Sequence, residues 1–324
     1  MNDSIEIIKK ELLKRKEKLA ENIPSDIEYR EDISKELGFN FFVKRDDILG
    51  KYGGNKVRKL EFLFPKINTK NVFMFGPTGS HHLIANLIYG KDRFDFTTFI
   101  FPTYLYKTGD EVIKKKTELV KRQSKRFIFV PNIAVAFAVS FVLSKIQRAF
   151  LIPPGSTSAE SSLGFVLSAI EIYEDVRKQK IPEPDLIFLP CGTGGTAAGL
   201  SVGIALCGLK TTLMAIQVVK TCRKFILKKI CDRIFHEMEK ILKTEQSEIK
   251  KHLKFEILSD FIGRGYGYPT KDGYEAMKFF RRFNIDSEPT YTSKTLSALI
   301  KLKEKLKGKN IIFYYTLNTL NILK

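Results

Sequence analysis

Residues 186–200, LIFLPCGTGGTAAGL, decide the fold of this chain. The run LIFLP has the length and apolar composition of a buried strand, and the small residues after GTGGT open a helix. A strand that turns through glycines into a helix is the unit of an α/β fold with a parallel sheet. Backbone N–H groups and hydroxyls from Thr193, Gly194, Gly195 and Thr196 then gather at the positive end of the helix dipole. The sequence therefore predicts a phosphate cradle at this turn.

The spacing of this cradle disfavours two common kinds of phosphate site. It lacks the GKS or GKT ending of a nucleotide-hydrolysing loop, and it does not match the G-x-G-x-x-G pattern of dinucleotide-binding folds. The pattern favours a smaller phosphorylated cofactor. An ordinary glycine-rich turn with no ligand is the alternative.

Similar apolar runs recur along the 324 residues, and most are separated by stretches of helical character. They are FNFFVKR near residue 40, NVFMFG at 71, TTFIFP at 97, RFIFV at 126, TLMAIQVV at 212 and NIIFYYT at 310. Alternating strands and helices predict parallel sheets covered on both faces. The length corresponds to about two domains.

One apolar stretch requires a test as a membrane span. Residues 127–144, FIFVPNIAVAFAVSFVLS, carry no charge and have a marginal length for crossing a bilayer. Pro131 and Asn132 divide the stretch, and Asn132 is a favoured helix cap. We therefore predict a strand, a turn and a buried helix, with no membrane partner.

The net charge of +19, from 55 Lys plus Arg against 36 Asp plus Glu, raises the possibility of a nucleic-acid partner. Lysine is frequent throughout the chain, however, so we interpret the excess as a solvated coat and predict no nucleic-acid binding. Its densest part, Lys220 to Lys254, has apolar residues at helical spacing and predicts an exposed amphipathic helix.

The four cysteines and four histidines show neither a disulfide framework nor zinc-ligand spacing, and we predict no metal site. The N-terminal residues are polar and lack the apolar core of a signal peptide. Together these features favour a cytoplasmic protein.

The stretch GGNKVRKL, residues 53–60, holds a candidate catalytic lysine. The two glycines make a tight turn, Asn55 is a favoured cap, and Lys56 falls at a helix start in line with apolar positions such as Leu60. A lysine held against apolar surface loses its charge more easily and becomes the amine nucleophile of Schiff-base chemistry. Lys59 lies beside it and could bind an anion. A solvated basic helix start is the alternative.

Two further stretches carry candidate site residues. GPTGSHH, residues 76–82, follows the NVFMF run and presents N–H groups and the Ser80 hydroxyl at a helix start, where a carboxylate would bind. The alternative there is a simple turn with Ser80 as its cap. Later, Tyr266 in GYGYPT and Tyr291 in EPTYTSK can place phenolic hydroxyls in a pocket as donors or proton carriers. Such tyrosines can also serve only to pack a core.

Taken in order, these motifs resemble one family of pyridoxal-phosphate enzymes, which comprises D-cysteine desulfhydrase and 1-aminocyclopropane-1-carboxylate (ACC) deaminase. Its fold is the tryptophan-synthase-β-like fold, or fold type II. The match covers nearly the whole chain and is carried by FFVKRDDILGKYGGNKVRKLEFL, TGSHH, IPPGSTSAESSLGF, CGTGGTAAGL, GYGYPTKDG and EPTYTSK. Their order and spacing make the match specific.

The resemblance implies pyridoxal 5'-phosphate as cofactor and two open, twisted, mostly parallel sheets flanked by helices. It further implies a larger cofactor-binding domain from residues 1–58 and 166–324, and a smaller α/β domain inserted at residues 59–165. The cofactor would lie in the cleft between them, and the protein would be a homodimer acting on a small amino acid.

The resemblance also assigns roles to residues. Lys56 would be the Schiff-base lysine and would act in catalysis with Ser80, Tyr266 and Tyr291. Cofactor contacts would come, besides Lys56, from Lys59, His81, Thr193, Gly194, Gly195, Thr196 and Thr316. The substrate would be bound by Ser80, His81, His82 and Thr292.

The implied reaction is α,β-elimination from D-cysteine, or a related β-substituted D-amino acid, to pyruvate, ammonia and hydrogen sulfide. Thr292 and Thr316 stand where the deaminases have Glu and Leu, which favours the desulfhydrase side. ACC deaminase is one alternative, and a cofactor-binding homologue with impaired activity is another. Two departures motivate the latter: His81 replaces the amide of a Ser-Asn-His motif, and Leu317-Asn318 replaces two glycines.

Overall fold

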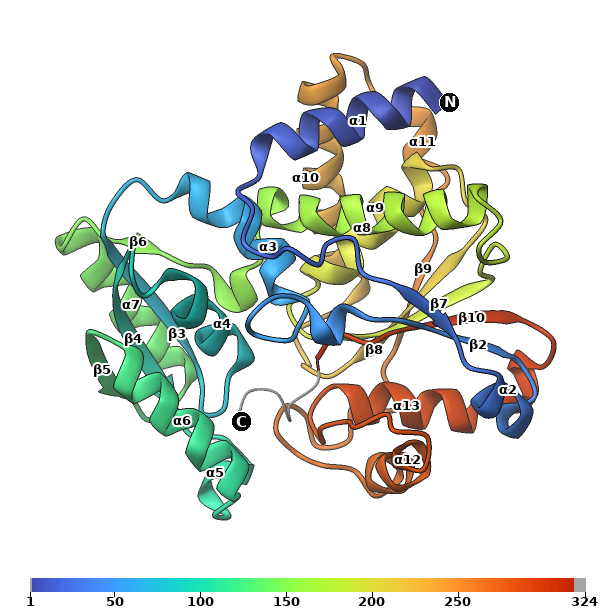
Figure 1. Cartoon of the computed structure of the whole chain (residues 1–324). Helices are drawn as coiled ribbons and strands as arrows, with labels where there is room; N and C mark the ends of the chain where they lie inside the picture. Colours follow the sequence, from blue (N-terminus) through green and yellow to red (C-terminus); the bar gives the residue numbers. More distant parts are fainter. Residues whose placement is uncertain (1, 318–324) are drawn as a thin grey trace.

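A computed structural model describes residues 2–317 and confirms the α/β class, with two sheets flanked by helices (Figure 1). The larger sheet has six strands in the order β1-β2-β10-β7-β8-β9, and the smaller has four in the order β5-β4-β3-β6. Strand β1 is antiparallel to β2, and the other pairs in both sheets are parallel. The strands are β1 (Ile27–Tyr29), β2 (Asn40–Lys44), β3 (Asn71–Pro77), β4 (Asp95–Phe101), β5 (Arg126–Phe129), β6 (Phe150–Leu151), β7 (Leu186–Cys191), β8 (Thr212–Gln217), β9 (Phe255–Leu258) and β10 (Asn310–Tyr314).

Helices cover both faces of each sheet. They are α1 (Asn2–Arg15), α2 (Glu31–Leu37), α3 (Lys56–Leu63), α4 (His81–Gly90), α5 (Tyr104–Lys107), α6 (Glu111–Gln123), α7 (Ile133–Ile146), α8 (Ala159–Arg177), α9 (Gly195–Leu206), α10 (Lys224–Leu242), α11 (Ser247–Lys250), α12 (Lys271–Arg281), α13 (Thr292–Lys301) and α14 (Lys303–Leu306). All seven apolar runs identified in the sequence are strands. The sequence reading missed β1, β6 and β9, which have two to four residues each and too short a pattern to stand out.

The six-stranded sheet separates two hydrophobic cores because side chains alternate along each strand. In β7, Ile187 and Leu189 pack in the core that contains α8, α9 and α10, whereas Phe188 packs in the core with α2, α12 and α13. Figure 1 shows these two helical layers on opposite sides of the sheet.

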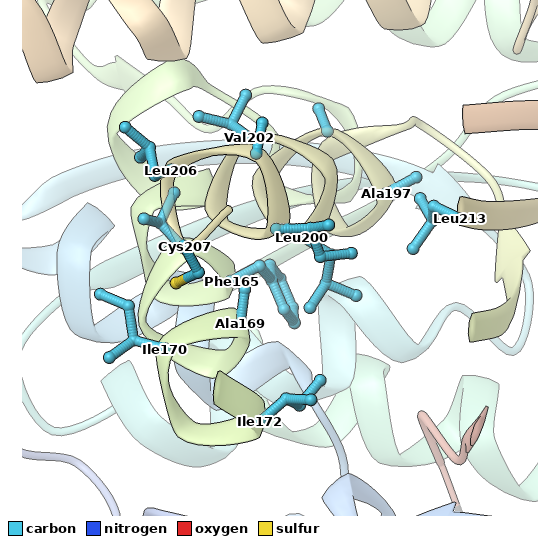
Figure 2. Packing of buried hydrophobic residues seen from close by; sticks show 14 of the residues in the cluster. Phe165, Ala169, Ile170, Ile172, Ala197, Leu200, Val202, Leu206, Cys207 and Leu213 are labelled. Carbon is cyan, nitrogen blue, oxygen red and sulfur yellow. The ribbon is translucent and has the colours of Figure 1, made fainter. Parts of the chain in front are cut away.

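Helices α8 and α9 pack unusually closely, as the interleaved side chains in Figure 2 show. Two glycines of α9 make this possible. A Cβ at Gly199 would lie 2.3 Å from the carbonyl oxygen of Ser162, and a Cβ at Gly203 would lie 2.5 Å from the Cβ of Ala169. The close contact fixes the start of α9, and with it the glycine loop that precedes this helix.

The strands of the smaller sheet all lie between Asn71 and Leu151, inside the predicted insertion at residues 59–165. Helix α3 runs through the first predicted boundary, and α8 runs through the second. These two helices also pack against each other. The division of the chain at residues 58 and 166 therefore stays a prediction.

The apolar stretch at residues 127–144 forms strand β5 and helix α7, with the Asn132 side chain accepting a hydrogen bond from the Val135 N–H as predicted. Within residues 2–317, no helix is long and apolar enough to cross a bilayer. The prediction that α7 is buried was wrong, because only one face packs on the smaller sheet. Its other face is exposed and apolar, with side chains from Ile133, Phe137, Phe141, Val142 and Ile146.

The basic segment from Lys220 to Lys254 contains the predicted amphipathic helix, α10. Its buried stripe is Leu227, Cys231, Ile234, Phe235 and Met238, while Phe225 is 62% exposed. The lysines lie on the outer face, in agreement with a solvated coat.

A buried ionic network fixes α3 to the larger sheet. Arg58, between the two candidate site lysines, donates to both carboxylate oxygens of Asp46 at 2.8 and 2.9 Å and to Glu171 at 2.6 and 2.8 Å. Lys44 donates to Glu171 at 2.7 Å, and the Tyr314 hydroxyl donates to Asp46 at 2.5 Å. Because each charge has partners, the network can be buried without an unpaired ion.

Candidate active site

A cleft of about 580 Å³ lies where strands of both sheets reach their carboxyl ends. This edge of open α/β sheets is where ligands commonly bind. Twelve of the thirteen residues predicted for the site line this cleft: Lys56, Lys59, Ser80, His81, His82, Thr193, Gly194, Gly195, Thr196, Tyr266, Tyr291 and Thr316.

Lys56 begins α3 and faces the cleft, while Leu60 is buried one turn later, in line with it. Desolvation lowers the pKa of its amine from 10.5 to about 8. A larger fraction of the amine is therefore uncharged near neutral pH, as a nucleophile or base requires. Asn55 occupies the cap position, but its side chain makes no capping hydrogen bond. Instead it accepts one from the Lys56 amine at 3.4 Å.

Lys59 lies beside the glycine loop. Its amine donates to Thr157 Oγ1 at 2.7 Å and to the Gly155 carbonyl at 3.1 Å. Burial lowers the pKa of this lysine well below 10.5. A bound phosphate would favour the charged form again, since an opposite charge stabilises it.

The glycine loop has the geometry of a phosphate cradle. Gly194 has φ of +88°, which directs the chain into α9, and the first N–H groups of this helix lack carbonyl partners within the helix. A Cβ at Gly195 would lie 2.8 Å from the Lys59 amine and 2.8 Å from Thr157 Cγ2. The space therefore depends on the absence of a side chain, and the residues present fit a small phosphorylated cofactor.

This geometry predicts that Gly195→Ala weakens binding of the phosphorylated cofactor by about 10- to 100-fold, since overpacking typically costs 1–3 kcal/mol. Gly192→Ala is the matched control in the same loop, because its Cβ would meet nothing closer than 3.4 Å. Fluorescence titration of apoprotein with pyridoxal phosphate measures both affinities. Equal affinities for the two variants would contradict a cradle at Gly195.

Ser80 and His82 present polar groups from the start of α4. The Ser80 hydroxyl makes no capping hydrogen bond to the helix, so the alternative that Ser80 serves only as the helix cap is not supported. His82 Nδ1 lies 2.9 Å from the Ser156 hydroxyl and 3.2 Å from the Asn86 amide nitrogen. When Nδ1 accepts from these two groups, the ring proton lies on Nε2. Within residues 2–317, His82 Nε2 has no partner, and desolvation lowers the pKa of this histidine to about 3. A neutral N–H donor next to Ser80 suits a carboxylate.

His81 is held at both ring nitrogens. Its Nδ1 lies 2.5 Å from the Tyr52 hydroxyl, and its Nε2 lies 3.2 Å from the Lys116 amine. Desolvation lowers the pKa of Lys116 to about 8 and that of His81 well below 6.5. At neutral pH the Lys116 ammonium therefore donates to Nε2 of a neutral ring.

Tyr266 and Tyr291 lie in the cleft as a pair, with ring centroids 5.6 Å apart in an edge-to-face arrangement. Burial raises the pKa of Tyr266 to about 12 and raises that of Tyr291 well above 10. Both phenols are therefore protonated near neutral pH and can act as donors.

Thr292 is the one predicted site residue that does not line the cleft. Its hydroxyl accepts a hydrogen bond from the Glu288 N–H at 3.0 Å, and the residue is buried at the start of α13. It is absent from the described residues that line the cleft, because the turn that exposes Tyr291 directs the next side chain inward. The substrate-binding role of Thr292 stays a prediction, and no cleft contact supports it.

The departure at the C-terminal motif is accommodated locally. Leu317 is buried in the core of the smaller sheet and forms an isolated bridge with Gly54, whose Cβ position lies 2.9 Å from Leu317 Cδ1. The Thr316 carbonyl accepts from the Asn55 N–H at 2.9 Å. Thr316 and Leu317 thus hold the loop that precedes Lys56 in place. Asn318 lies outside the described residues.

Sequence reasoning missed three polar residues beside the site: Tyr52, Lys116 and Thr157. Lys116 is hidden in the run Lys114-Lys115-Lys116, although its spacing from Val120 places it on the buried face of α6. The turn-rich motif around Thr157 was recognised, but no residue in it was selected. Within residues 2–317, no group of three or more His, Cys, Asp or Glu side chains could hold a metal ion.

Comparisons with known proteins show the family to which this chain belongs. The family model described as pyridoxal-phosphate dependent enzyme matches residues 21–316. A Thermotoga maritima protein named "Putative 1-aminocyclopropane-1-carboxylate deaminase" is 26% identical over 308 residues, which cover 90% of this chain and 93% of that protein. A Pyrococcus furiosus protein of the same name is 28% identical over 302 residues, which cover 90% and 88%.

Solved structures show the same fold. The crystal structure of an ACC deaminase homologue matches with a TM-score of 0.77 and 25% identity, over 95% of this chain and 94% of that chain. Threonine deaminase isoform 2 from Solanum lycopersicum matches with a TM-score of 0.64 at 16% identity, over 98% and 85%, which shows the fold alone. The resemblance found in the motifs is thus confirmed at the level of family and cofactor. The chain belongs to the pyridoxal-phosphate dependent enzymes of fold type II.

Proposed function

We propose that this protein is a lyase that degrades D-cysteine, or a related β-substituted D-amino acid, to pyruvate, ammonia and hydrogen sulfide. The observation that carries the proposal is the position of Lys56. Its amine faces the cleft that contains the glycine loop, with a pKa lowered to about 8 by desolvation. For D-cysteine the overall reaction consumes one water and forms one molecule of each product.

When bound, pyridoxal phosphate supplies an electron sink for the α-carbon of the amino acid. Lys59, the hydroxyls of Thr193 and Thr196 and the N–H groups at the start of α9 hold its phosphate. The Lys56 amine takes the proton from the substrate α-carbon, for which a pKa near the working pH is favourable.

The substrate carboxylate binds at the start of α4 in this proposal. His82 Nε2–H and the Ser80 hydroxyl donate to it, and the helix N-terminus contributes its positive potential. Neutral His82 serves here better than a charged one, because a buried imidazolium beside Lys56 and Lys59 would be repelled.

The tyrosine pair provides proton donors at the other side of the cleft. Tyr266 and Tyr291 stay protonated because burial raises the pKa of each. A phenol can donate to a sulfur that develops negative charge as the carbon–sulfur bond breaks.

ACC deaminase is the second candidate, and it is favoured by the names of the relatives from Thermotoga maritima and Pyrococcus furiosus. The first candidate, the D-cysteine lyase, is supported by Thr316, which lines the cleft. By the resemblance, the deaminases have Leu at this position. A third candidate is a cofactor-binding homologue with impaired activity. It is supported by His81, since both ring nitrogens are already engaged by Tyr52 and Lys116.

A substrate panel distinguishes these candidates. Purified protein with pyridoxal phosphate is incubated with D-cysteine, L-cysteine, D-serine and ACC, and pyruvate, 2-oxobutyrate, ammonia and sulfide are measured. We expect sulfide and pyruvate in equal amounts from D-cysteine. Ammonia and 2-oxobutyrate from ACC alone would favour the deaminase. Cofactor absorbance without any product would favour the third candidate.

We also propose that the protein is a cytoplasmic homodimer, as the resemblance implies. The exposed apolar face of α7 supports a contact with a second copy, because contiguous apolar surface of this kind commonly marks an interface. Light scattering coupled to size exclusion measures the molar mass, and a mass near 37.1 kDa would contradict the dimer.

A further inference from the structure

Two cysteines lie together beneath the phosphate loop. Cys191 is the last residue of β7, directly before Gly192, and Cys222 lies in the connection between β8 and α10. Both are buried free thiols, and their sulfur atoms are 2.8 Å apart. Even the smaller carbon atoms make their best non-bonded contact at about 3.5–4.0 Å. The two sulfur atoms are therefore closer than separate thiols prefer.

The backbone holds the two sulfur atoms in this arrangement. Cys191 pairs with Gln217 in the β7–β8 register, and the Val218 N–H donates to the Cys191 carbonyl at 3.0 Å. The Gln217 side-chain amide then donates to the Cys222 carbonyl at 2.6 Å. One glutamine thus connects the two cysteine-bearing segments, so the proximity does not depend on a flexible side chain alone.

We propose that Cys191 and Cys222 form a reversible disulfide when the protein meets a hydroperoxide. A disulfide has a sulfur–sulfur distance of about 2.05 Å, so the bond needs less than about 1 Å of movement. Cys191 lines the cleft, which gives a small oxidant a route to the pair.

The chemistry of this step is balanced. One sulfur attacks the peroxide, the O–O bond breaks, and a sulfenic acid and one water (or one alcohol) are formed. The second sulfur then displaces the hydroxyl group, which leaves as water when it takes the remaining thiol proton. Two thiols are oxidised by two electrons and one hydroperoxide is reduced. A dithiol reductant reverses the reaction by exchange.

The disulfide would restrict movement of the residues that pack under the phosphate loop. The Cβ position of Gly194 lies 4.0 Å from Cys222 Sγ, and Leu227 and Ile230 pack beside it. The two cysteines are 31 positions apart, and the intervening chain includes α9 and β8. Linking them reduces the conformational freedom of the unfolded chain and stabilises the folded one.

Peptide mapping tests the proposal directly. Holoprotein is treated with hydrogen peroxide, alkylated, digested with trypsin without reductant and analysed by mass spectrometry. We expect residues 181–210, which include Cys191, linked to residues 221–223, which include Cys222. Because Cys207 lies in the same first peptide, the digest is repeated with Cys207→Ala, which should form the same linkage.

A thermal measurement gives an independent test. Peroxide should raise the melting temperature of the holoprotein by about 3–10 °C, and dithiothreitol should reverse the shift. Cys222→Ser should show no shift, and Cys222→Ala replaces it if the serine variant does not fold. Four alkylated thiols after peroxide, oxidation of the pair only to sulfinic acid, or a linkage that excludes Cys222 would each overturn the proposal.

Discussion

Lys56→Ala is expected to abolish covalent attachment of pyridoxal phosphate and to lower turnover by at least about 10³-fold, the contribution of a lost nucleophile and base. The physical reason is that Lys56 presents to the cleft an amine whose pKa desolvation lowers to about 8. After borohydride reduction, the intact mass of the wild-type protein should increase by one reduced cofactor. The mass of the variant should remain unchanged.

The matched control is Lys51→Ala, five residues earlier in the same loop and exposed to solvent. It should retain the borohydride-fixed cofactor and the wild-type turnover. If borohydride still fixes one cofactor to the Lys56 variant, another lysine carries it. Lys59 is then the first candidate, because it is buried in the same cleft, beside the glycine loop that precedes α9.

Glu171→Gln is expected to lower the free energy of unfolding at pH 7 by about 3–5 kcal/mol, because it leaves charged partners buried without their carboxylate. Arg58 donates two hydrogen bonds to Glu171, and Lys44 donates one. Urea unfolding followed by circular dichroism measures the loss. Glu111→Gln is the control, since the Glu111–Lys114 pair is exposed and such pairs contribute about 0–1 kcal/mol.

The pH dependence gives a second check on Glu171. Burial by itself would raise the pKa of this carboxyl, but attraction to Arg58 and Lys44 lowers it from 4.5 to about 2. Stabilisation by this group is therefore complete above pH 4.5 and is lost as the pH falls toward 2. The difference between wild type and variant should narrow from pH 7 to pH 3.5. A constant difference would show that the carboxylate charge is not what stabilises the network.

Several features of the protein could be predicted from residues that are close in the sequence. The strand, the glycine turn and the helix at residues 186–200 are local, because hydrophobic periodicity and backbone freedom are properties of consecutive residues. Lys56 was selected as a candidate for the same reason, since a cap residue, a helix start and an apolar stripe lie within one short segment. The order of such segments was sufficient to indicate the family and the cofactor.

Other features depended on which segments pack together. Tyr52, His81 and Lys116 come from three segments. Packing of α6 on α4 brings Lys116 to one ring nitrogen of His81, and the loop before α3 brings Tyr52 to the other. Thr292 was expected in the cleft, but the turn held by Glu288 directs it inward. The exposed face of α7 could not be predicted for the same reason. The apolar composition of a helix does not reveal how many of its faces are covered by neighbouring elements.

The sequence by itself therefore determined the α/β class and indicated the glycine loop and the lysine that line the cleft, because each follows from a short-range pattern. The tertiary structure decided which polar groups face the cleft, how Arg58 anchors α3 to the larger sheet, and that Cys191 meets Cys222. These contacts join residues that are between 12 and 113 positions apart. Their geometry is fixed by sheet register and helix packing, which no local pattern contains.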